Sequence, residues 1–222
     1  TYSVIQRVLE KRLNWEITDS DTKNDLFWCD TNVNVNFCLK MKPWQFVNHF
    51  PGTSAISRKV ELSKNFFNLQ RFFPDEYNFH PKSFAMPTER LLLKQHISSA
   101  PQNKRTFLIK PDLGSKGKGI YLIQDPESAQ RVNELAIAQE CIPPYLIEGL
   151  KFDFRVYALV TSVDPLRVYV YKDGLARFCT ELYEEPNPKN LNKTYKFLTN
   201  YSVNKTNKNF EQFHDGQGHK RS

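Results

Sequence analysis

Apolar residues recur at helical spacing in two segments of the first half of the chain. Residues 1–13, "TYSVIQRVLEKRL", have this spacing, and so do residues 57–73, "SRKVELSKNFFNLQRFF". Both segments are predicted to be amphipathic helices, and we expect the second helix to turn its phenylalanines towards a core. A short helix is also predicted at residues 88–97, and the Pro51-Gly52 pair marks a turn.

Strand-like patterns and turns dominate from Thr106 onward. "TFLIK", "IYLI" and "AIAQECI" are short apolar runs, and "DPES" is typical of a helix start between them. "FDFRVYALVTS" alternates with the period of a strand. In "LRVYVYKDGLARF", the Asp173-Gly174 pair predicts a hairpin turn between two strands. The pattern as a whole predicts an α+β fold with mixed and antiparallel sheets and flanking helices.

The same patterns predict three regions along the chain. Residues 1–100 form a mixed N-terminal region that leads into the linker-like segment "SSAPQNKR", and residues 101–210 form the region that carries the suspected chemistry. Residues 211–222 are polar and contain glycine without periodicity, so we expect a flexible tail there.

The charge balance narrows the kinds of partner. Lys and Arg number 31 against 24 Asp and Glu, a net charge of +7, which favours an anionic partner: a nucleotide, a nucleic acid, an acidic lipid or an acidic protein segment. The four cysteines are scattered with no CxxC pair, so metal-ligand spacing is absent and we expect the reduced thiols of a cytoplasmic protein. No apolar run approaches the ~18 residues that suggest a membrane span.

The stretch "KPDLGSKGKGIYLI", residues 110–123, carries the first candidate chemistry. Its glycine spacing matches neither a Walker A loop nor a Rossmann turn, because the loop leads into a strand. A glycine-rich hairpin tip with Lys116 and Lys118 could fold over the phosphates of a nucleotide, or it could be a solvated tip that the lysines keep soluble. Lys110 ends an apolar strand, where an ammonium group needs an anionic partner such as phosphate.

A second candidate site follows on "LKFDFRVY". If Phe152 and Phe154 point into a core, then Lys151, Asp153 and Arg155 share the opposite face of the strand. They could be a surface ladder of ion pairs or the lining of a site, and the cations at residues 110–118 favour the site.

Two further segments hold polar candidates. Arg177 lies among apolar residues in "GLARF", just after the predicted hairpin turn. "LTNYSVNK", residues 198–205, gathers short hydrogen-bonding side chains and reads by itself as a turn or a helix cap.

Several of these strings together resemble one protein family. "NHFPGT", "KPDLGSKGKGIYLI", "QECI", "LIEGLKFDFRVYALVTSVDPLRVYVYKDGLARF" and "LTNYSVNK", in this order, resemble the tubulin tyrosine ligase-like family and, within it, the glutamate-adding tubulin polyglutamylases. The similarity spans roughly residues 15–210. It implies an ATP-grasp ligase that holds ATP between two antiparallel sheet layers, phosphorylates a glutamate side chain of the acidic tubulin tail, and joins free glutamate to the resulting acyl phosphate.

The resemblance also implies a role for each candidate residue. The residues implied to bind ATP are Lys110, Lys118, Gly119 and Lys151 at the phosphates, Gln139, Glu140, Cys141 and Ile142 at the adenine, Asp153 at the ribose, and Thr199 and Asn200 at the border of the nucleotide. Arg155 is implied to be the catalytic residue at the transferred phosphoryl group. The residues implied to hold the amino-acid substrate are Arg177, Tyr201, Ser202 and Lys205.

The match to the family has departures. Leu113, Lys116 and Cys141 differ from the usual residues at their positions, which adjusts the loop and the adenine hinge without removing either. Family members bind Mg²⁺ with an Asp and a later Glu-x-Asn beyond "LTNYSVNK", and no such segment precedes Ser222. We therefore expect no metal ligands in this chain, and a ligase domain that is partial as given.

The expected cofactors are ATP and Mg²⁺, and the expected partners are free glutamate and the tubulin tail on the microtubule, with no nucleic acid and no membrane. The expected location is the cytoplasm and its cytoskeleton, including the cilium or axoneme. Two alternatives stay open: a non-catalytic microtubule- or axoneme-associated protein that retains the fold, and a ligase that adds glycine.

Overall fold

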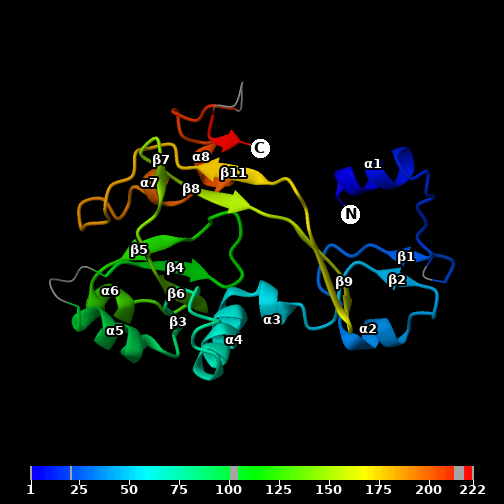
Figure 1. The fold of residues 1–222 in the computed structure, drawn as a ribbon, viewed down its shortest axis with the longest axis horizontal. Helices are drawn as coiled ribbons and strands as arrows, with labels where there is room; N and C mark the ends of the chain where they lie inside the picture. Colours follow the sequence, from blue (N-terminus) through cyan, green and yellow to red (C-terminus); the bar gives the residue numbers. More distant parts are fainter. Residues whose placement is uncertain (1, 21, 101–104, 213–217, 222) are drawn as a thin grey trace. The chain divides into compact units, whose positions relative to one another are not determined.

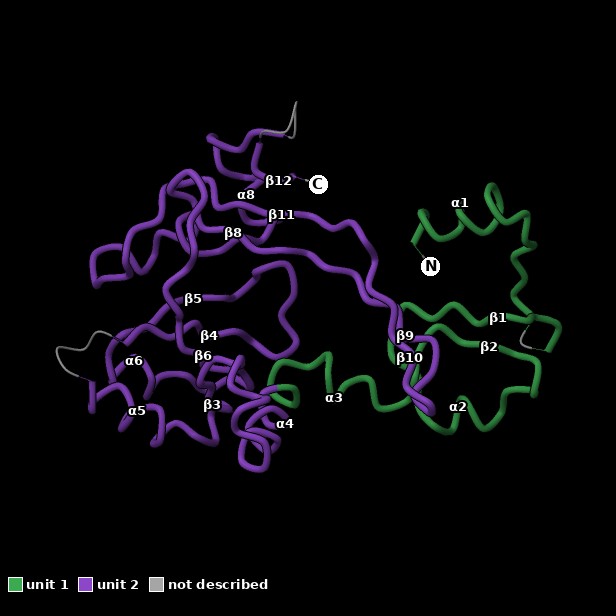
Figure 2. The backbone as a smooth tube through the Cα atoms, in the orientation of Figure 1, with its two compact units in different colours: residues 1–62 green, residues 63–222 purple. Residues whose placement is uncertain are grey.

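The chain folds into two compact units in a computed structural model that describes residues 2–20, 22–100, 105–212 and 218–221. Unit 1 comprises Thr1–Leu62 and unit 2 comprises Ser63–Ser222 (Figure 2). The boundary expected near residue 100 lies inside unit 2, and the core of the linker-like segment, residues 101–104, lies outside the described residues. Among the described residues, no helix is both long and apolar enough to cross a membrane.

Unit 1 is built from short elements. They are α1 (Ser3–Lys11), β1 (Leu26–Phe27), α2 (Val35–Leu39), β2 (Phe46–Val47), α3 (Ser54–Ser57) and the start of α4 (Lys59–Phe72). The predicted N-terminal helix is confirmed as α1, although it buries none of its residues. The predicted turn at Pro51-Gly52 is also confirmed, with Gly52 in the left-handed region at φ +83°.

The phenylalanine-rich helix α4 forms where the sequence predicts it, but its apolar face is only partly buried. Val60 is buried, whereas Phe67, Phe72 and Phe73 are 60%, 74% and 51% exposed, so the expectation of a fully core-facing helix is wrong for these three side chains. Phe66 shows the physical reason, because its ring packs against the residues that follow the helix rather than against a sheet. Its ring centroid lies 5.2 Å from that of Phe79 and 4.8 Å from that of His80.

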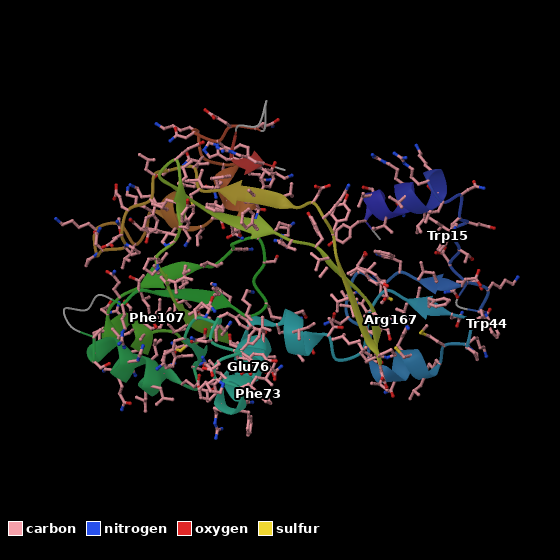
Figure 3. All side chains as sticks on the ribbon, in the orientation of Figure 1. Trp15, Trp44, Phe73, Glu76, Phe107 and Arg167 are labelled. Carbon is pink, nitrogen blue, oxygen red and sulfur yellow. The ribbon has the colours of Figure 1, made fainter. Side chains whose placement is uncertain are left out.

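A four-stranded antiparallel sheet forms the main core of unit 2. Its strands are β3 (Ser83–Met86), β4 (Phe107–Pro111), β5 (Tyr121–Ile123) and β6 (Ala136–Glu140), in the order β3-β6-β4-β5. The helices α5 (Arg90–Ser98) and α6 (Pro126–Gln130) lie beside this sheet (Figure 1). They contribute Leu93, Ile97 and Ala129 to the same buried cluster. Phe107, labelled in Figure 3, is fully buried in it.

The predicted elements of this sheet are confirmed. The side chain of Asp125 caps α6, since its carboxylate accepts a hydrogen bond from the N–H of Ser128 at 2.7 Å. The β4–β5 hairpin carries the glycine loop between its strands.

A second four-stranded sheet has the order β12-β11-β8-β7. Its strands are β7 (Leu146–Ile147), β8 (Leu150–Arg155), β11 (Leu175–Phe178) and β12 (Lys220–Arg221). Because Lys220 and Arg221 pair with β11, this part of the expected flexible tail is a strand. Phe154 is 70% exposed, so the expectation that it points into the core is wrong, whereas Phe152 is half-buried and stacks on Phe178.

The predicted hairpin at Asp173-Gly174 is wrong. The strand β10 (Leu166–Val170) pairs with the preceding strand, β9 (Ala158–Val163), through a turn at residues 164–165, and β11 pairs with β8. Asp173-Gly174 therefore connects two different sheets. A Cβ atom at Gly174 would lie 2.5 Å from the carbonyl oxygen of Arg155, so the glycine serves a close approach of two backbones. The β9–β10 pair extends away from β8 and β11 in Figure 1.

Two short helices complete unit 2. They are α7 (Thr194–Phe197) and α8 (Tyr201–Asn204), and α8 lies within the "LTNYSVNK" segment. This segment was predicted to be a turn or a cap, and it forms a single helical turn that follows Asn200.

Candidate functional site

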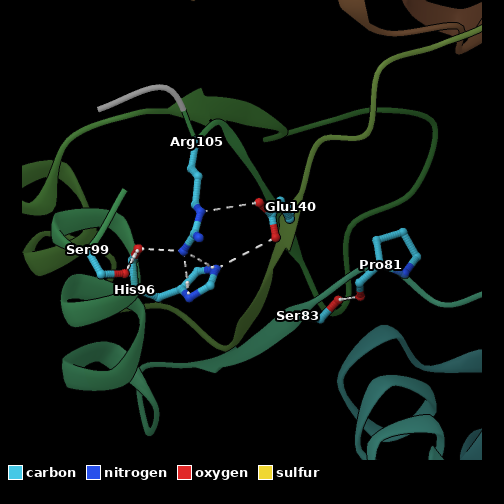
Figure 4. A network of polar contacts seen from close by, with 6 residues as sticks. All are labelled: Pro81, Ser83, His96, Ser99, Arg105 and Glu140. Atoms are coloured by element: carbon cyan, nitrogen blue, oxygen red, sulfur yellow. Dashed lines mark hydrogen bonds and ion pairs between the residues drawn. The ribbon is translucent and has the colours of Figure 1, made fainter. Parts of the chain in front are cut away.

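The base of the glycine loop is fixed by a chain of polar side chains across the first sheet. The ammonium group of Lys110 donates a hydrogen bond to Gln139 Oε1 at 2.6 Å, and Gln139 Nε2 donates to Ser83 Oγ at 3.1 Å. The hydroxyl of Ser83 donates in turn to the carbonyl oxygen of Pro81 at 2.8 Å (Figure 4). These bonds set the orientation of the Gln139 amide and hold Lys110 at the end of β4. Ser83 was missed from the sequence because nothing near residue 83 signals its position beside Gln139.

The charges of two lysines affect the pKa of one thiol, that of Cys141, which follows β6. Burial raises the pKa of the Cys141 thiol, and the ammonium groups of Lys151 and Lys110 oppose this shift. Lys151 also opposes the effect of burial on Cys179, whose pKa is raised to about 12. The structure therefore brings Lys110 of β4 and Lys151 of β8 within electrostatic range of Cys141, which directly follows β6. Two ammonium groups in one place are suited to a polyanion.

Asp153 and Arg177 form a bidentate ion pair across the β8–β11 ladder. Arg177 Nε donates to Asp153 Oδ1 at 2.8 Å, and Arg177 Nη2 donates to Asp153 Oδ2 at 2.5 Å. The two residues are direct partners in the strand register. This pairing raises the pKa of Arg177, while burial acts in the opposite direction. Asp153, which the resemblance assigns to the ribose, and Arg177, which it assigns to the amino-acid substrate, therefore contact each other.

The glycine loop lies against the "LTNYSVNK" segment. Gly117, at φ +81°, faces this segment so closely that a Cβ atom there would lie 2.8 Å from Val203 Cγ2 and 2.9 Å from Asn200 Oδ1. The loop tip and Asn200, which are 83 positions apart in the numbering of the chain, are thus neighbours. Lys118, next in the chain, is exposed and can reach solvent or a ligand.

Asn204 anchors that segment and was not among the predicted residues. Its side chain is 1% exposed, and its Oδ1 accepts hydrogen bonds from both the N–H and the hydroxyl of Thr180. Its Nδ2 donates to the carbonyl oxygens of Leu198 and Asn200. Two of these hydrogen bonds tie α8 to Thr180, which follows β11, and the other two hold it to the residues that precede the helix. The sequence carried only the general cluster of polar residues as a signal.

The hinge at the end of β6, residues 139–142, forms hydrogen bonds with the two segments on either side of it. The N–H of Glu140 donates to Lys82 O and that of Cys141 to Thr106 O, both at 2.8 Å. The carboxylate of Glu140 lies 3.7 Å from His96 Nε2 and 3.8 Å from Arg105 Nε (Figure 4). Burial and the positive charges of Lys82 and Arg105 lower the pKa of His96, against the opposing effect of Glu140. Ile142, which follows the hinge, is 63% exposed.

The residues expected at the amino-acid substrate lie near β11 and β12. The ammonium groups of Lys205 and Lys220 lie 5.8 and 5.4 Å from the centroid of the Tyr201 ring. Lys220 is also the strand partner of Arg177, so two ammonium groups lie near the Tyr201 ring beside β11. Ser202 lies on the same helical turn as Tyr201.

Three expected residues stand apart from these contacts. Arg155 lies exposed at the end of β8, in register with Leu175. Gly119, at φ +72°, ends the exposed part of the loop, and Thr199 is half-buried before Asn200.

Metal ligands were sought among the same side chains. Within residues 2–20, 22–100, 105–212 and 218–221, no group of three or more His, Cys, Asp or Glu side chains could hold a metal ion. The two lysines beside the hinge have the charge that suits a phosphate group.

Comparison with known proteins finds relatives that match most of the chain. A probable beta-tubulin polyglutamylase of Tetrahymena thermophila is 37% identical over 227 residues, which cover 100% of this chain and 19% of that protein. The tubulin polyglutamylase TTLL11 of Mus musculus is 48% identical over 189 residues, 81% of this chain and 25% of the relative. The chain thus spans about a quarter or less of the length of these curated relatives.

A solved structure shares the fold. The C-terminal domain of K. lactis Pby1, described as an ATP-grasp enzyme interacting with the mRNA decapping enzyme Dcp2, matches with a TM-score of 0.56 and 20% identity over 85% of this chain and 58% of that one. This likeness confirms the expected α+β, ATP-grasp fold. The profile of the tubulin-tyrosine ligase family matches residues 37–222. The chain therefore belongs to the tubulin-tyrosine ligase family.

Proposed function

We propose that this chain supplies the ATP-binding and amino-acid-binding part of a ligase that adds glutamate to glutamate side chains of the tubulin tail. The observation that carries the proposal is the position of Lys110, whose ammonium group bonds to Gln139 in the hinge at 2.6 Å. Lys110 and Lys151 both oppose the raised pKa of Cys141, and two ammonium groups beside the hinge suit the phosphates of a nucleoside triphosphate. The relatives named tubulin polyglutamylases supply the substrate class.

The proposed roles follow the geometry. Lys110 and Lys151 contact the phosphates, with Lys118 and Gly119 closing over them from the loop. The adenine lies along Gln139–Ile142, and since the N–H groups of Glu140 and Cys141 already bond within the protein, recognition uses the hinge carbonyls and the N–H of Ile142. Thr199 and Asn200 border the nucleotide on the side where Gly117 meets Asn200.

The Asp153–Arg177 pair marks the junction between the two substrates. Asp153 accepts hydrogen bonds from the ribose hydroxyls, and Arg177 binds the carboxylate of free glutamate in the bidentate geometry that it now offers to Asp153. Tyr201, Ser202 and Lys205 line the remainder of the amino-acid site.

The chemistry is carboxylate activation. An oxygen of the acceptor carboxylate attacks the γ-phosphorus of ATP, ADP leaves, and an acyl phosphate forms. The amino nitrogen of free glutamate then attacks the acyl carbon, phosphate leaves, and the nitrogen loses a proton as the amide forms. Arg155 neutralises the charge that spreads over the transferred phosphoryl group. Mg²⁺ is the metal proposed for the whole enzyme, and no step of the reaction is assigned to it here.

The proposed setting is the cytoplasmic cytoskeleton, including ciliary microtubules. A net charge of +7 favours the encounter with an acidic tubulin tail through long-range attraction. This attraction weakens as salt screens the charges.

Two experiments test the proposal. Calorimetric titration of this chain with ATP should give saturable binding that Lys110→Ala and Lys151→Ala each weaken at least tenfold, while an exposed-lysine control, Lys172→Ala, leaves the affinity unchanged. The full-length protein should also incorporate labelled glutamate, rather than glycine, into tubulin in an ATP-dependent reaction that Arg155→Ala abolishes. ATP binding without any ligation would favour a non-catalytic relative, and a preference for glycine would overturn the glutamate assignment.

A further inference from the structure

A cluster of aromatic side chains lies at the end of α4, outside the site described above. Phe73, Tyr77 and Phe79 line an open cavity of about 500 Å³ together with Glu76. Figure 3 labels Phe73 and Glu76, which lie close together beside this helix. Three aromatic rings and one carboxylate are therefore the whole lining of this cavity among the described residues.

The rings are held in place by one another rather than by a hydrophobic core. The ring centroids of Phe73 and Tyr77 are 6.4 Å apart, and those of Tyr77 and Phe79 are 6.0 Å apart. Phe66 lies behind them, with its centroid 6.1 Å from Tyr77 and 5.2 Å from Phe79 in an edge-on contact. The cluster is thus preformed, yet Phe73 remains 51% exposed and Phe79 67% exposed.

The charge of the cavity selects the kind of ligand. The faces of aromatic rings attract cations, and a carboxylate beside them adds a full negative charge. The cation–π contacts within the described part of the chain involve Phe84, Tyr201 and Phe178, so none of them fills this cavity. No ion pair or hydrogen bond of the Glu76 carboxylate is present among the described residues either.

We propose that Phe73, Tyr77, Phe79 and Glu76 form a docking site for a basic side chain, lysine or arginine, that a partner polypeptide presents. The long exposed edges of Phe73 and Phe79 leave the cavity open, which suits the end of a side chain anchored on a separate protein surface more than an enclosed small molecule. The site is distinct from the cationic site that binds the anionic substrates, and it does not depend on the proposed function.

The test uses the 222-residue chain and three probes: the peptide acetyl-Gly-Lys-Gly-amide, the same peptide with norleucine in place of lysine, and tetramethylammonium. Backbone amide shifts in residues 73–80 report binding at the site. The lysine peptide should move these shifts saturably, and the uncharged norleucine peptide should bind at least about threefold more weakly, because it lacks the cation–π attraction.

Variants distinguish binding at this site from non-specific binding elsewhere on the protein. Glu76→Gln and Phe73→Leu should each weaken the lysine peptide about threefold. Phe67→Leu is the matched control, since Phe67 is exposed on the same helix outside the cavity and its loss should change nothing. Glu76→Gln changes only an exposed carboxylate, so it preserves the fold and keeps the test decisive if Phe73→Leu does not fold.

Three results would overturn the proposal. Equal binding of the norleucine peptide would make the cluster an apolar surface without charge selectivity. An unchanged affinity in Glu76→Gln and Phe73→Leu would place the cation elsewhere. Binding of tetramethylammonium without binding of the lysine peptide would replace a protein partner by a small cation.

Discussion

Arg177 donates two hydrogen bonds to Asp153 from the neighbouring strand, at 2.8 and 2.5 Å, so a guanidinium and a carboxylate of the candidate site neutralise each other. The side chains are 16% and 37% exposed. A guanidinium and a carboxylate in this fork geometry form one of the stronger kinds of ion pair, and partial burial protects it from screening. The pair can therefore stabilise the β8–β11 ladder and keep Arg177 oriented for a second carboxylate.

This pair should be worth about 1 kcal/mol to the free energy of unfolding. A double-mutant cycle with Asp153→Asn and Arg177→Gln, measured by urea unfolding, gives the coupling energy directly. The matched control is Glu184→Gln, which removes the more exposed ion pair between Lys196 and Glu184 and should cost less. A coupling energy of zero for Asp153 and Arg177 would mean that their contact contributes no stability.

The close approach of the glycine loop to α8 predicts a specific effect of Gly117→Ala. An L-residue at φ +81° is strained by about 1 kcal/mol, and the added Cβ would also overlap Val203 and Asn200. The loop should shift away from Asn200, and the affinity for ATP should fall about tenfold, an effect of the size that one disrupted positioning contact can have.

Gly52→Ala is the control for that variant, since Gly52 has φ +83° but no heavy atom within 4 Å of the added Cβ. Both variants should lose similar stability from backbone strain, and only Gly117→Ala should lose nucleotide affinity in calorimetry. Equal affinities for ATP would show that the loop does not need its contact with α8.

Sequence patterns predicted the elements that depend on neighbouring residues, and they failed where residues distant in the chain determine the structure. The helix at residues 59–72, the strand at residues 107–111 and the Asp125 cap follow from neighbours in the chain, and local periodicity found them. The pairing of β10 with β9 instead of β11 did not follow, because the Asp173-Gly174 pair is an equally good local turn in a connection between sheets.

The candidate site divides along the same line. The charged residues on β8 and β11 could be named from residue type and alternation, but their mutual ion pair could not, because it depends on the strand register. The roles of Asn204 and Ser83 could not be predicted from the sequence for a similar reason. Their importance comes from burial and from partners at positions 180 and 139, and nothing in their own neighbourhood distinguishes them from other polar residues.

Asn204→Ala should be strongly destabilising. It removes four hydrogen bonds from a side chain that is 1% exposed and leaves the buried N–H of Thr180 without its partner. We expect a loss of about 3 kcal/mol in urea unfolding. Asn209→Ala, on the exposed segment after α8, should cost less than about 0.5 kcal/mol. Equal effects of the two variants would contradict the anchoring role.

Ser83→Ala should weaken ATP binding without touching the nucleotide itself. It removes the hydroxyl that orients the Gln139 amide and so loosens the hydrogen bond that holds Lys110. The dissociation constant for ATP should rise about threefold to tenfold, the size expected for one lost neutral hydrogen bond, and Ser83→Thr should restore it. Ser99→Ala is the control, because the Ser99 hydroxyl donates, among the described residues, to the carbonyl oxygen of His96 in α5. An unchanged affinity in Ser83→Ala would separate Lys110 from this chain of hydrogen bonds.

His80 should make the stability of unit 2 sensitive to acid. Burial, and then the charge of Lys110, lower its pKa below the ordinary value. The folded state therefore binds the proton less readily than the unfolded chain, whose His pKa is about 6.5. The contribution of neutral His80 is complete above this pH and is lost as the pH falls towards and through the lower pKa of the folded state.

Unfolding in urea at pH 7.5 and pH 5.5 should show a smaller loss of stability for His80→Asn than for the unsubstituted chain. The comparison between the two pH values removes the constant cost of the lost contact with Ser63, at 3.2 Å, and with the Phe66 ring. An equal or larger loss in the variant would show that the protonation of His80 is not linked to folding.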